Sequence, residues 1–347
     1  MSNRDGRRRR NQRRAVVAVV LVSALLGAAL VATIGSLNRD LYSASGFVRQ
    51  YLDALARQDV SSALMLPGVT PTDDQLEAAD LPQDLPRTLL RPSVLGELTD
   101  IRLTGDSETA QDRHTVVYGF RLDGEPAQMT FQVAHTGTFF GVFDSWRFET
   151  SPLAVLQVTV LHEATFSIDQ LTLDARAHAA KGAPAAFSNQ AAYLAFAPAR
   201  YTMGHTSALL SSPPQTVTVT ASGTTDVTID AQPNEQFVTQ VQDELDSFLN
   251  ACTTQQVLQP SGCPFGIEIN DRVTEPPLWS IAEYPQVTLT GGDSTFEMPE
   301  TPGHAHIVVE VQSLFDGEVE TRDEDVPLSV AISVTVNPDG SLALQLH

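Results

Sequence analysis

Residues 45–66, SGFVRQYLDALARQDVSSALML, carry an amphipathic pattern from which the architecture of the chain can be built outward. Apolar side chains recur three or four positions apart and therefore share one face of a helix. These positions are Phe47, Val48, Tyr51, Leu52 and Leu55. Asp59 and Ser61 provide capping groups for a second, short helical turn. The pattern predicts two helices, the first with a broad apolar face that needs a partner layer.

The partner layer is predicted by the segments that follow. A loop rich in proline and acid runs from Pro67 to about Pro92, with a short helix around Gln75 to Ala79. Period-two alternation then begins at Ile101 and continues through HTVVYGFRL, which ends at an Asp-Gly turn at positions 123–124. The runs MTFQVAHT and SWRFE continue the strands. Two helices followed by a strand meander indicate an α+β fold, with a curved sheet folded around the first helix.

The block after Asn234 repeats this order. The run 235–252, EQFVTQVQDELDSFLNAC, predicts a helix of about four turns with one apolar face. That face comprises Phe237, Val241, Leu245, Phe248 and Leu249. Strand-like runs follow at 278–290, 303–317, 326–336 and 341–346. Asp316–Gly317 corresponds in position to Asp123–Gly124, and residues 337–340, NPDG, signal a last hairpin. We infer an internal duplication at the level of fold.

Residues 153–232, between the two blocks, have a different character. Strand-like runs such as VLQVTVL and QTVTVTA are punctuated by Pro, Ser and Thr, which is typical of small β-sandwiches. The segment 198–219, PARYTMGHTSALLSSPPQTVTV, resembles the closing half of PEGA domains. We therefore expect a small PEGA-like sandwich here.

The segment FVRQYLDALARQDVSSAL resembles the opening helix of NTF2-like domains of exported bacterial proteins. This resemblance implies two NTF2-like helix-plus-curved-sheet domains, at 45–152 and 233–347, flanking the sandwich. The overall plan is also similar to that of teicoplanin-resistance-associated membrane proteins, although the cysteine-containing zinc ribbon at their amino terminus is absent. NTF2-like folds serve dehydratases, isomerases and non-catalytic binding modules, so the resemblance does not fix an activity.

A membrane segment precedes this body. Residues 15–34, AVVAVVLVSALLGAALVATI, contain no charge and are long enough to cross about 30 Å of hydrocarbon. The head, residues 1–14, contains seven arginines and one acid, and arginine next to a span stays on the cytoplasmic side. We predict a transmembrane signal anchor at 15–36, a linker at 37–44 and an extracytoplasmic body.

Other readings of the same segment remain open. A cleaved secretory signal usually has an apolar core of only about 7–15 residues, but Thr33 and Gly35 are small enough to precede a cleavage point. A twin-arginine signal at Arg13–Arg14 lacks its usual continuation, and no cysteine follows for a lipid anchor. A buried helix of a soluble protein does not explain the arginine head.

The net charge of the body limits the classes of partner that it can bind. The head contributes +6, and subtracting this from the net charge of −21 leaves −27 on the remainder. Such a body repels nucleic acid and anionic lipid. The partners that we expect are the membrane, through residues 15–36, and an envelope protein or cell-wall component, with no nucleic acid.

Cys252 and Cys263 are the only cysteines. Outside the cytoplasm so close a pair is expected to form a disulfide. A zinc site would need further ligands nearby, and none is visible in the sequence.

Signatures of catalysis are missing. The chain contains no Gly-rich phosphate loop, HExxH, SxxK or GxSxG motif. His304, His306 and Glu310 share one face of a strand and are the best metal candidates, but alternation with Ile307, Val309 and Val311 on the other face explains them without a metal. The acids from Asp316 to Asp325 lack the calcium-loop spacing.

The first NTF2-like domain offers a few residues that could line a cavity, and these are Tyr51, Asp100, His114 and Tyr118. Because both tyrosines have apolar neighbours in the pattern, we expect their side chains to lie in the core. We expect Trp146 and Trp279 to pack against the sheets rather than to stack on a ligand. We therefore name no catalytic residue and no cofactor. The leading hypothesis is a non-catalytic binding or scaffold module of the cell envelope. The alternative is an anchored NTF2-like isomerase or dehydratase that acts on a small apolar molecule. A third hypothesis is a structural spacer.

Overall fold

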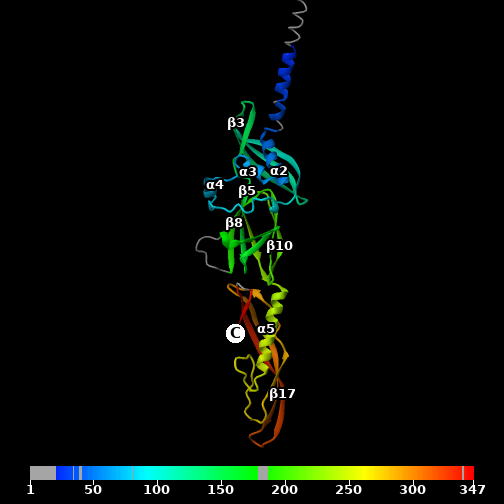
Figure 1. The fold of residues 1–347 in the computed structure, drawn as a ribbon, viewed down its shortest axis with the longest axis vertical. Coiled ribbons are helices and arrows are strands. Elements are labelled where there is room, and N and C mark those ends of the chain that lie inside the picture. Colours follow the sequence, from blue (N-terminus) through cyan, green and yellow to red (C-terminus); the bar gives the residue numbers. More distant parts are fainter. Residues whose placement is uncertain (1–20, 34, 39–40, 80, 179–186, 338–339) are drawn as a thin grey trace, which may run out of the picture. The chain divides into compact units, whose positions relative to one another are not determined.

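The computed structural model describes residues 21–33, 35–38, 41–79, 81–178, 187–337 and 340–347. The arginine head and the first residues of the apolar segment, to residue 20, lie outside the described residues, as do Pro338 and Asp339 of the last expected turn. Helices and antiparallel sheets follow one another along the chain, which confirms the α+β class (Figure 1).

The chain divides into two compact units. Unit 1 comprises Met1–Gln157, Ala192–Tyr201 and Thr216–Asp226. Unit 2 comprises Val158–Ala191, Thr202–Gln215 and Val227–His347. The division passes through strands of the middle segment, so that segment contributes residues to both units.

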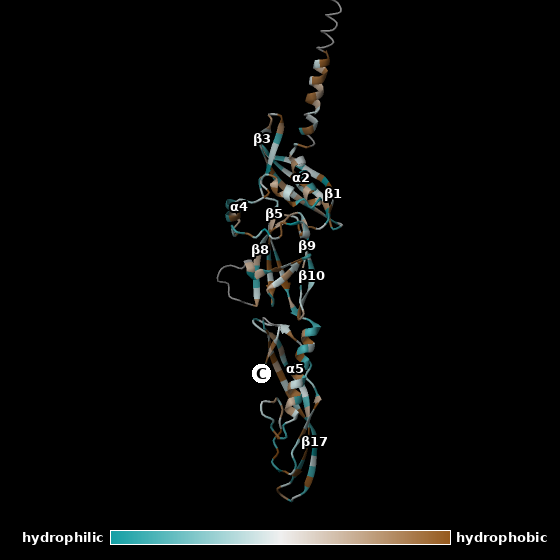
Figure 2. Ribbon diagram, viewed as in Figure 1, coloured by the Kyte–Doolittle hydropathy of each residue, from teal (hydrophilic) through white to brown (hydrophobic). Residues whose placement is uncertain are grey.

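The apolar segment forms a helix long and apolar enough to cross a membrane, at Leu21–Asn38. Its mean hydropathy is 1.8 and none of its length is buried against the rest of the protein. Figure 2 shows the helix predominantly brown, the colour of hydrophobic residues. A helix with an apolar surface on all sides needs an apolar surrounding, which a bilayer supplies.

The first helices form as the sequence pattern predicts. Helix α2, Ala44–Ala56, is capped by the Ser43 side chain, and α3, Val60–Met65, by the side chain of Asp59. Helix α4, Asp73–Ala78, begins with a capping box between Thr72 and Gln75. These side chains accept the backbone N–H groups that the first turn of a helix leaves unpaired.

Four strands form an antiparallel meander in the order β1-β2-β3-β4. They are β1, Leu98–Ala110; β2, Arg113–Leu122; β3, Glu125–Phe139; and β4, Phe143–Phe148. A two-residue turn, Asp123–Gly124, joins β2 to β3 with positive φ at both positions, as a tight hairpin requires. Register shifts in β1 and near the end of β3 curve the sheet.

The apolar face of α2 packs on this curved sheet. Phe47, Tyr51, Phe131 and Phe148 are at most 7 % exposed. Their rings contact one another, with the Tyr51 and Phe148 centroids 5.4 Å apart. The space between α2 and the sheet is thus filled by aromatic side chains.

The middle segment forms two sheets, with strand orders β12-β10-β9-β6-β7 and β11-β5-β8. Its strands are β5, Leu153–Leu161; β6, Thr165–Ile168; β7, Leu171–Asp174; β8, Ser188–Phe196; β9, Ala199–Thr206; β10, Leu210–Val219; β11, Gly223–Asp230; and β12, Gln232–Pro233. The first four residues of β5 are all buried, which shows that both faces of the strand are covered there, and the later residues alternate between buried and half-buried.

Two short 3-10 turns lie outside these sheets, at Pro92–Val94 and Ala175–His178.

The C-terminal part of unit 2 places one long helix on a second antiparallel sheet. Helix α5, Glu235–Thr253, is capped by Asn234 and buries Phe237, Val241, Leu245 and Leu249. The sheet contains β13, Arg272–Val273; β14, Leu278–Glu283; β15, Thr290–Gly291; β16, Phe296–Gln312; β17, Val319–Val336; and β18, Leu342–Leu346. Its buried side chains and those of α5 form one apolar cluster.

The structure corrects three expectations about these strands. The run 278–290 is split into β14 and β15, with Tyr284–Leu289 between them. Strand β16 ends at Gln312, and Leu314 and Phe315 lie in the following loop, 73 % and 99 % exposed. The two helix-on-sheet layers also differ in order, because β13, β14 and β15 all pair with β16 rather than forming a meander.

Candidate functional site

A cavity of about 700 Å³ lies within unit 2 and is the largest that we describe. It is lined by the residues around His162 at the end of β5, by Phe187 before β8, by the Ser207–Leu210 turn and by the ends of β16 and β17. Aromatic and aliphatic walls are combined with the polar side chains of Glu163, Arg176 and Asp293. Apolar walls with a few polar groups are typical of ligand-binding cavities.

His162 is held by a specific set of contacts. Its Nδ1 lies 2.8 Å from Asp230 Oδ1, and the Gln232 amide donates to the same oxygen at 2.7 Å. The imidazole stands edge-on to the Phe187 ring, 5.1 Å away. A Cβ on Gly291 would lie 2.4 Å from the imidazole, so only glycine allows the backbone to approach the ring this closely.

The His162–Asp230 pair resembles the base-and-orienter arrangement of catalytic histidines in its contacts. The surroundings favour a different role. The side chain of His162 is only 12 % exposed, because Phe187 and the Gly291 backbone cover its ring. The contacts therefore fix the position of the imidazole in the wall of the cavity.

Arg176 contributes a positive charge to the cavity. Its guanidinium donates two hydrogen bonds to the Asp174 carboxylate, at 3.1 and 2.8 Å. These hydrogen bonds lower the pKa of Asp174 and raise the pKa of Arg176. The pair stays ionised at neutral pH, so Asp174 balances the charge of Arg176, and the carboxylates of Glu163 and Asp293 also line the cavity.

A second cleft, of about 370 Å³, lies within unit 1 between α4 and the strands β5 and β8. Its walls are mainly apolar, with Leu76, Leu81, Val155 and Leu194 among them. The Gln75 side chain, which caps α4, donates to the carbonyl of Glu149 and thereby holds α4 beside this cleft. The cleft can accept an apolar group.

The metal candidates expected from the sequence lie on β16 and each has a protein partner. His304 Nδ1 is 3.0 Å from Glu283, and His306 contacts both Asp323 and Asp325. Glu310 accepts a hydrogen bond from Thr274. In the part of the chain that the structure describes, no three His, Cys, Asp or Glu side chains converge in a way that could hold a metal ion.

The residues considered for a cavity under α2 are divided between core and surface. Tyr51 is fully buried and its hydroxyl donates to the Ala197 carbonyl at 2.8 Å. Burial raises the pKa of Tyr51 well above its usual value, and that of Tyr118 to a lesser degree. Asp100 and His114 lie on β1 and β2, where His114 pairs with Asp106 at 2.8 Å. These four residues do not form one site.

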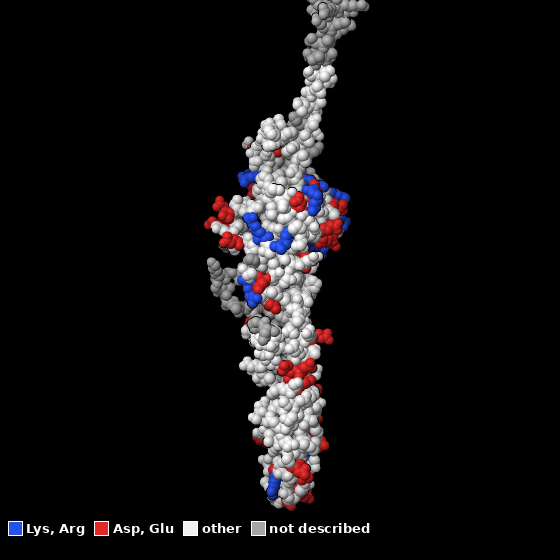
Figure 3. All heavy atoms as spheres, viewed as in Figure 1, with Lys and Arg blue, Asp and Glu red and all other residues white. Residues whose placement is uncertain are grey.

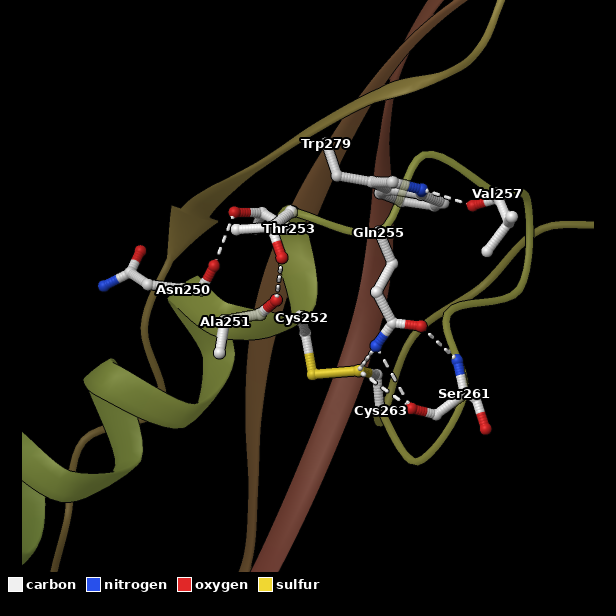
Figure 4. Close-up of a disulfide and its surroundings, with 10 residues drawn as sticks. Asn250, Ala251, Cys252, Thr253, Gln255, Val257, Ser261, Cys263 and Trp279 are labelled. Atoms are coloured by element: carbon white, nitrogen blue, oxygen red, sulfur yellow. Dashed lines mark hydrogen bonds between the residues drawn. A yellow bond between two sulfur atoms is a disulfide. The ribbon is translucent and has the colours of Figure 1, made fainter.

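The cysteines are joined by a disulfide between the end of α5 and the following loop (Figure 4). The Gln255 side chain donates to the Ser261 carbonyl and accepts from the Ser261 backbone N–H, which closes the same loop. Trp279 donates its indole N–H to Val257 at 2.8 Å and packs against Phe265. The disulfide and Trp279 therefore hold the loop against the C-terminal sheet.

The sequence did not point to His162, Asp230, Phe187 or Phe296. His162 and Asp230 are 68 positions apart and belong to no motif. The one local signal was a histidine directly after a strongly apolar run, at positions 153–161. Comparison of the chain with protein-family models, curated proteins and solved structures found no match.

Proposed function

We propose that this chain is a single-pass membrane protein whose body lies outside the cytoplasm and acts as a non-catalytic binding or scaffold module of the cell envelope. The observation that carries this proposal is the apolar helix Leu21–Asn38, none of which is buried by the rest of the protein. Its arginine-rich head keeps the amino terminus in the cytoplasm. The disulfide between Cys252 and Cys263 agrees with an oxidising compartment for the body.

The packing of both helix-on-sheet layers favours a binding role over the NTF2-like enzyme alternative. An enzyme of that type needs a cavity with ionisable groups between helix and sheet. Under α2 the space is occupied by Phe47, Tyr51, Phe131 and Phe148. Under α5 it is occupied by a continuous apolar cluster that includes Phe237, Leu245 and Ile307. An apolar-faced helix on a curved sheet remains compatible with a non-catalytic NTF2-like module.

The binding role is assigned to the cavity beside His162. This cavity combines the Asp174–Arg176 ion pair with the aromatic walls of Phe187 and Phe296. A ligand with an apolar part and uncharged hydrogen-bonding groups would satisfy both. We propose that an envelope protein or a cell-wall component supplies such a ligand.

Membrane anchoring is tested by extraction of cell membranes with alkaline carbonate. The wild-type chain should stay in the pellet, and Leu25→Arg/Leu26→Arg should release it, because each arginine at the centre of a span costs about 3 kcal/mol. Leu314→Arg/Phe315→Arg is the matched control, since it makes the same change in an exposed loop and should leave the protein in the pellet. Release of the wild type would contradict the proposal, and loss of an amino-terminal tag would support the cleaved-signal alternative.

A further inference from the structure

The tip of the β3–β4 hairpin, Phe139–Val142, exposes large apolar side chains. Phe139 is 57 % exposed, Phe140 82 % and Val142 40 %. The tip is closed by a hydrogen bond from the Val142 N–H to the Phe139 carbonyl. Exposed apolar side chains that are adjacent to one another mark a surface for a partner or a membrane.

The backbone at the hairpin tip makes Phe140 an unexpected choice. Phe140 has φ of 50° and Gly141 has φ of 72°. Asn-Gly or Asp-Gly is the usual pair in such a turn, because a bulky residue is strained at positive φ. The Asp123–Gly124 turn of the same sheet follows this rule, with φ of 49° and 84°. Folding alone thus favours a small polar residue at 140, and an exposed phenylalanine points to a role in binding.

The hairpin tip is attached to the end of the apolar helix. Asn38, the last residue of that helix, donates its side-chain amide to the Val142 carbonyl at 2.6 Å. The Tyr42 ring stacks on Phe143 with centroids 4.5 Å apart. Trp146 donates its indole N–H to the Tyr42 carbonyl at 2.7 Å. Wherever the helix leaves a bilayer, these contacts keep the hairpin tip beside that point.

The described residues next to the hairpin tip are mainly apolar, while the charged residues Arg39, Asp40 and Asp144 adjoin them in the sequence. Leu37 and Leu41, at the helix end, are 37 % and 46 % exposed. Residues 41–48 and 135–143 contain no Asp, Glu, Lys or Arg. The end of unit 1 near the β3 label of Figure 1 is accordingly almost entirely white in Figure 3. An otherwise acidic body therefore exposes little negative charge on these described residues, which favours approach to lipid headgroups.

We propose that the hairpin tip inserts into the headgroup region of the bilayer that holds the apolar helix, with Phe139 and Phe140 as the inserted side chains. This inference rests on the membrane anchoring proposed above. Apolar side chains at the level of the headgroups are stabilised by burial among the upper acyl chains, while the uncharged polar backbone stays hydrated. Helix and hairpin tip together would hold the first unit against the membrane surface at two points.

The test is tryptophan quenching by brominated lipid. The full chain is reconstituted in vesicles of phosphatidylcholine with brominated acyl chains, as wild type and as Phe140→Trp. Emission is measured as the difference between variant and wild type, because Trp146 and Trp279 are present in both. Met65→Trp is the matched control, since Met65 is a 75 % exposed apolar residue of the same unit outside the hairpin and the helix end. The tryptophan at 140 should be quenched at least about twofold more strongly than the one at 65.

Each result separates the two proposals. If alkaline carbonate strips the chain from the vesicles, membrane anchoring itself is wrong. If the chain stays bound and tryptophan at 140 is quenched no more than at 65, anchoring stands and the insertion of the hairpin tip is wrong. A third result is a blue-shifted emission that is not quenched by brominated lipid and that increases with the protein-to-lipid ratio. It would show that the hairpin tip packs against a second copy of the chain, and it would overturn the inference. Phe139→Trp repeats the test if Phe140→Trp shows a lowered melting temperature.

Discussion

At the residue scale, the burial of Tyr51 makes the stability of the fold depend on pH. Its phenol is fully buried, donates to the Ala197 carbonyl and has a raised pKa, chiefly because burial disfavours the phenolate. The folded protein therefore keeps a proton that the unfolded chain loses from about pH 10 upward. Since the folded state then binds more protons than the unfolded state, the free energy of unfolding must fall as the pH rises above this value.

Tyr51→Phe tests this linkage. At pH 7 the variant should be less stable by about 1 kcal/mol, because the Ala197 carbonyl loses its donor. Above about pH 10 its unfolding free energy should decline less steeply than that of the wild type. Tyr118→Phe is the control with a smaller change in slope, because the pKa of Tyr118 is raised less than that of Tyr51. Denaturant titrations across this pH range measure both quantities, and equal slopes for all three proteins would refute the argument.

Gly68 and Gly124 form a matched pair for separating steric clash from backbone strain. Their φ values are 81° and 84°. A Cβ at Gly68 would lie within 2.2 Å of the Phe148 carbonyl oxygen, whereas a Cβ at Gly124 meets nothing within 4 Å. Gly124→Ala should cost about 1 kcal/mol of unfolding free energy, and Gly68→Ala about 3 kcal/mol or more. Equal losses in thermal or denaturant unfolding would show that the loop carrying Gly68 is not held against β4.

At the element scale, the disulfide after α5 is expected to stabilise the fold by restricting the unfolded chain. With a sequence separation of 11, the chain-entropy model gives about 3 kcal/mol. Cys252→Ala/Cys263→Ala should therefore lower the unfolding free energy by about this amount. A reductant should destabilise the wild type to a similar degree and leave the double variant unchanged. An effect of reductant on the double variant would mean that something other than this disulfide is responsible.

The helices were predictable in detail because their signals are local. The apolar face from Phe237 to Leu249 runs through α5, so the period of this helix could be read from the sequence. The Asp123–Gly124 hairpin was predictable for the same reason. Leu314 and Phe315 were wrongly assigned to a strand, because an apolar residue in a loop resembles one in a sheet when neighbours are unknown.

The candidate site could not be predicted because its contacts are not local. Asp230 reaches His162 from another strand, and Gly291 reaches the same ring from a third segment. None of these residues belongs to a sequence motif that would indicate a site. The hairpin tip is an intermediate case, since its Phe-Phe-Gly sequence was visible but its exposure and its contact with Asn38 required the structure.

At the scale of the whole molecule, the apolar helix, the acidic body and the disulfide together support the proposed location. Each feature supports the others. In the proposed topology the arginines of the head retain the amino terminus inside, the net charge of −27 left on the remainder disfavours binding to nucleic acid or to anionic lipid, and the disulfide agrees with an oxidising compartment. In that proposed topology the body meets its partners on the outer side of the membrane.

The most direct test determines, in the same intact cells, on which side of the membrane the carboxyl terminus lies and whether the two cysteines are oxidised. A tag after His347 should be cleaved by added protease while an amino-terminal tag is protected until the cells are opened. Alkylation before denaturation should leave Cys252 and Cys263 unmodified. Mass spectrometry should then find the two residues joined by a disulfide. A protected carboxyl-terminal tag together with two alkylated thiols would place the body in the cytoplasm and contradict the account.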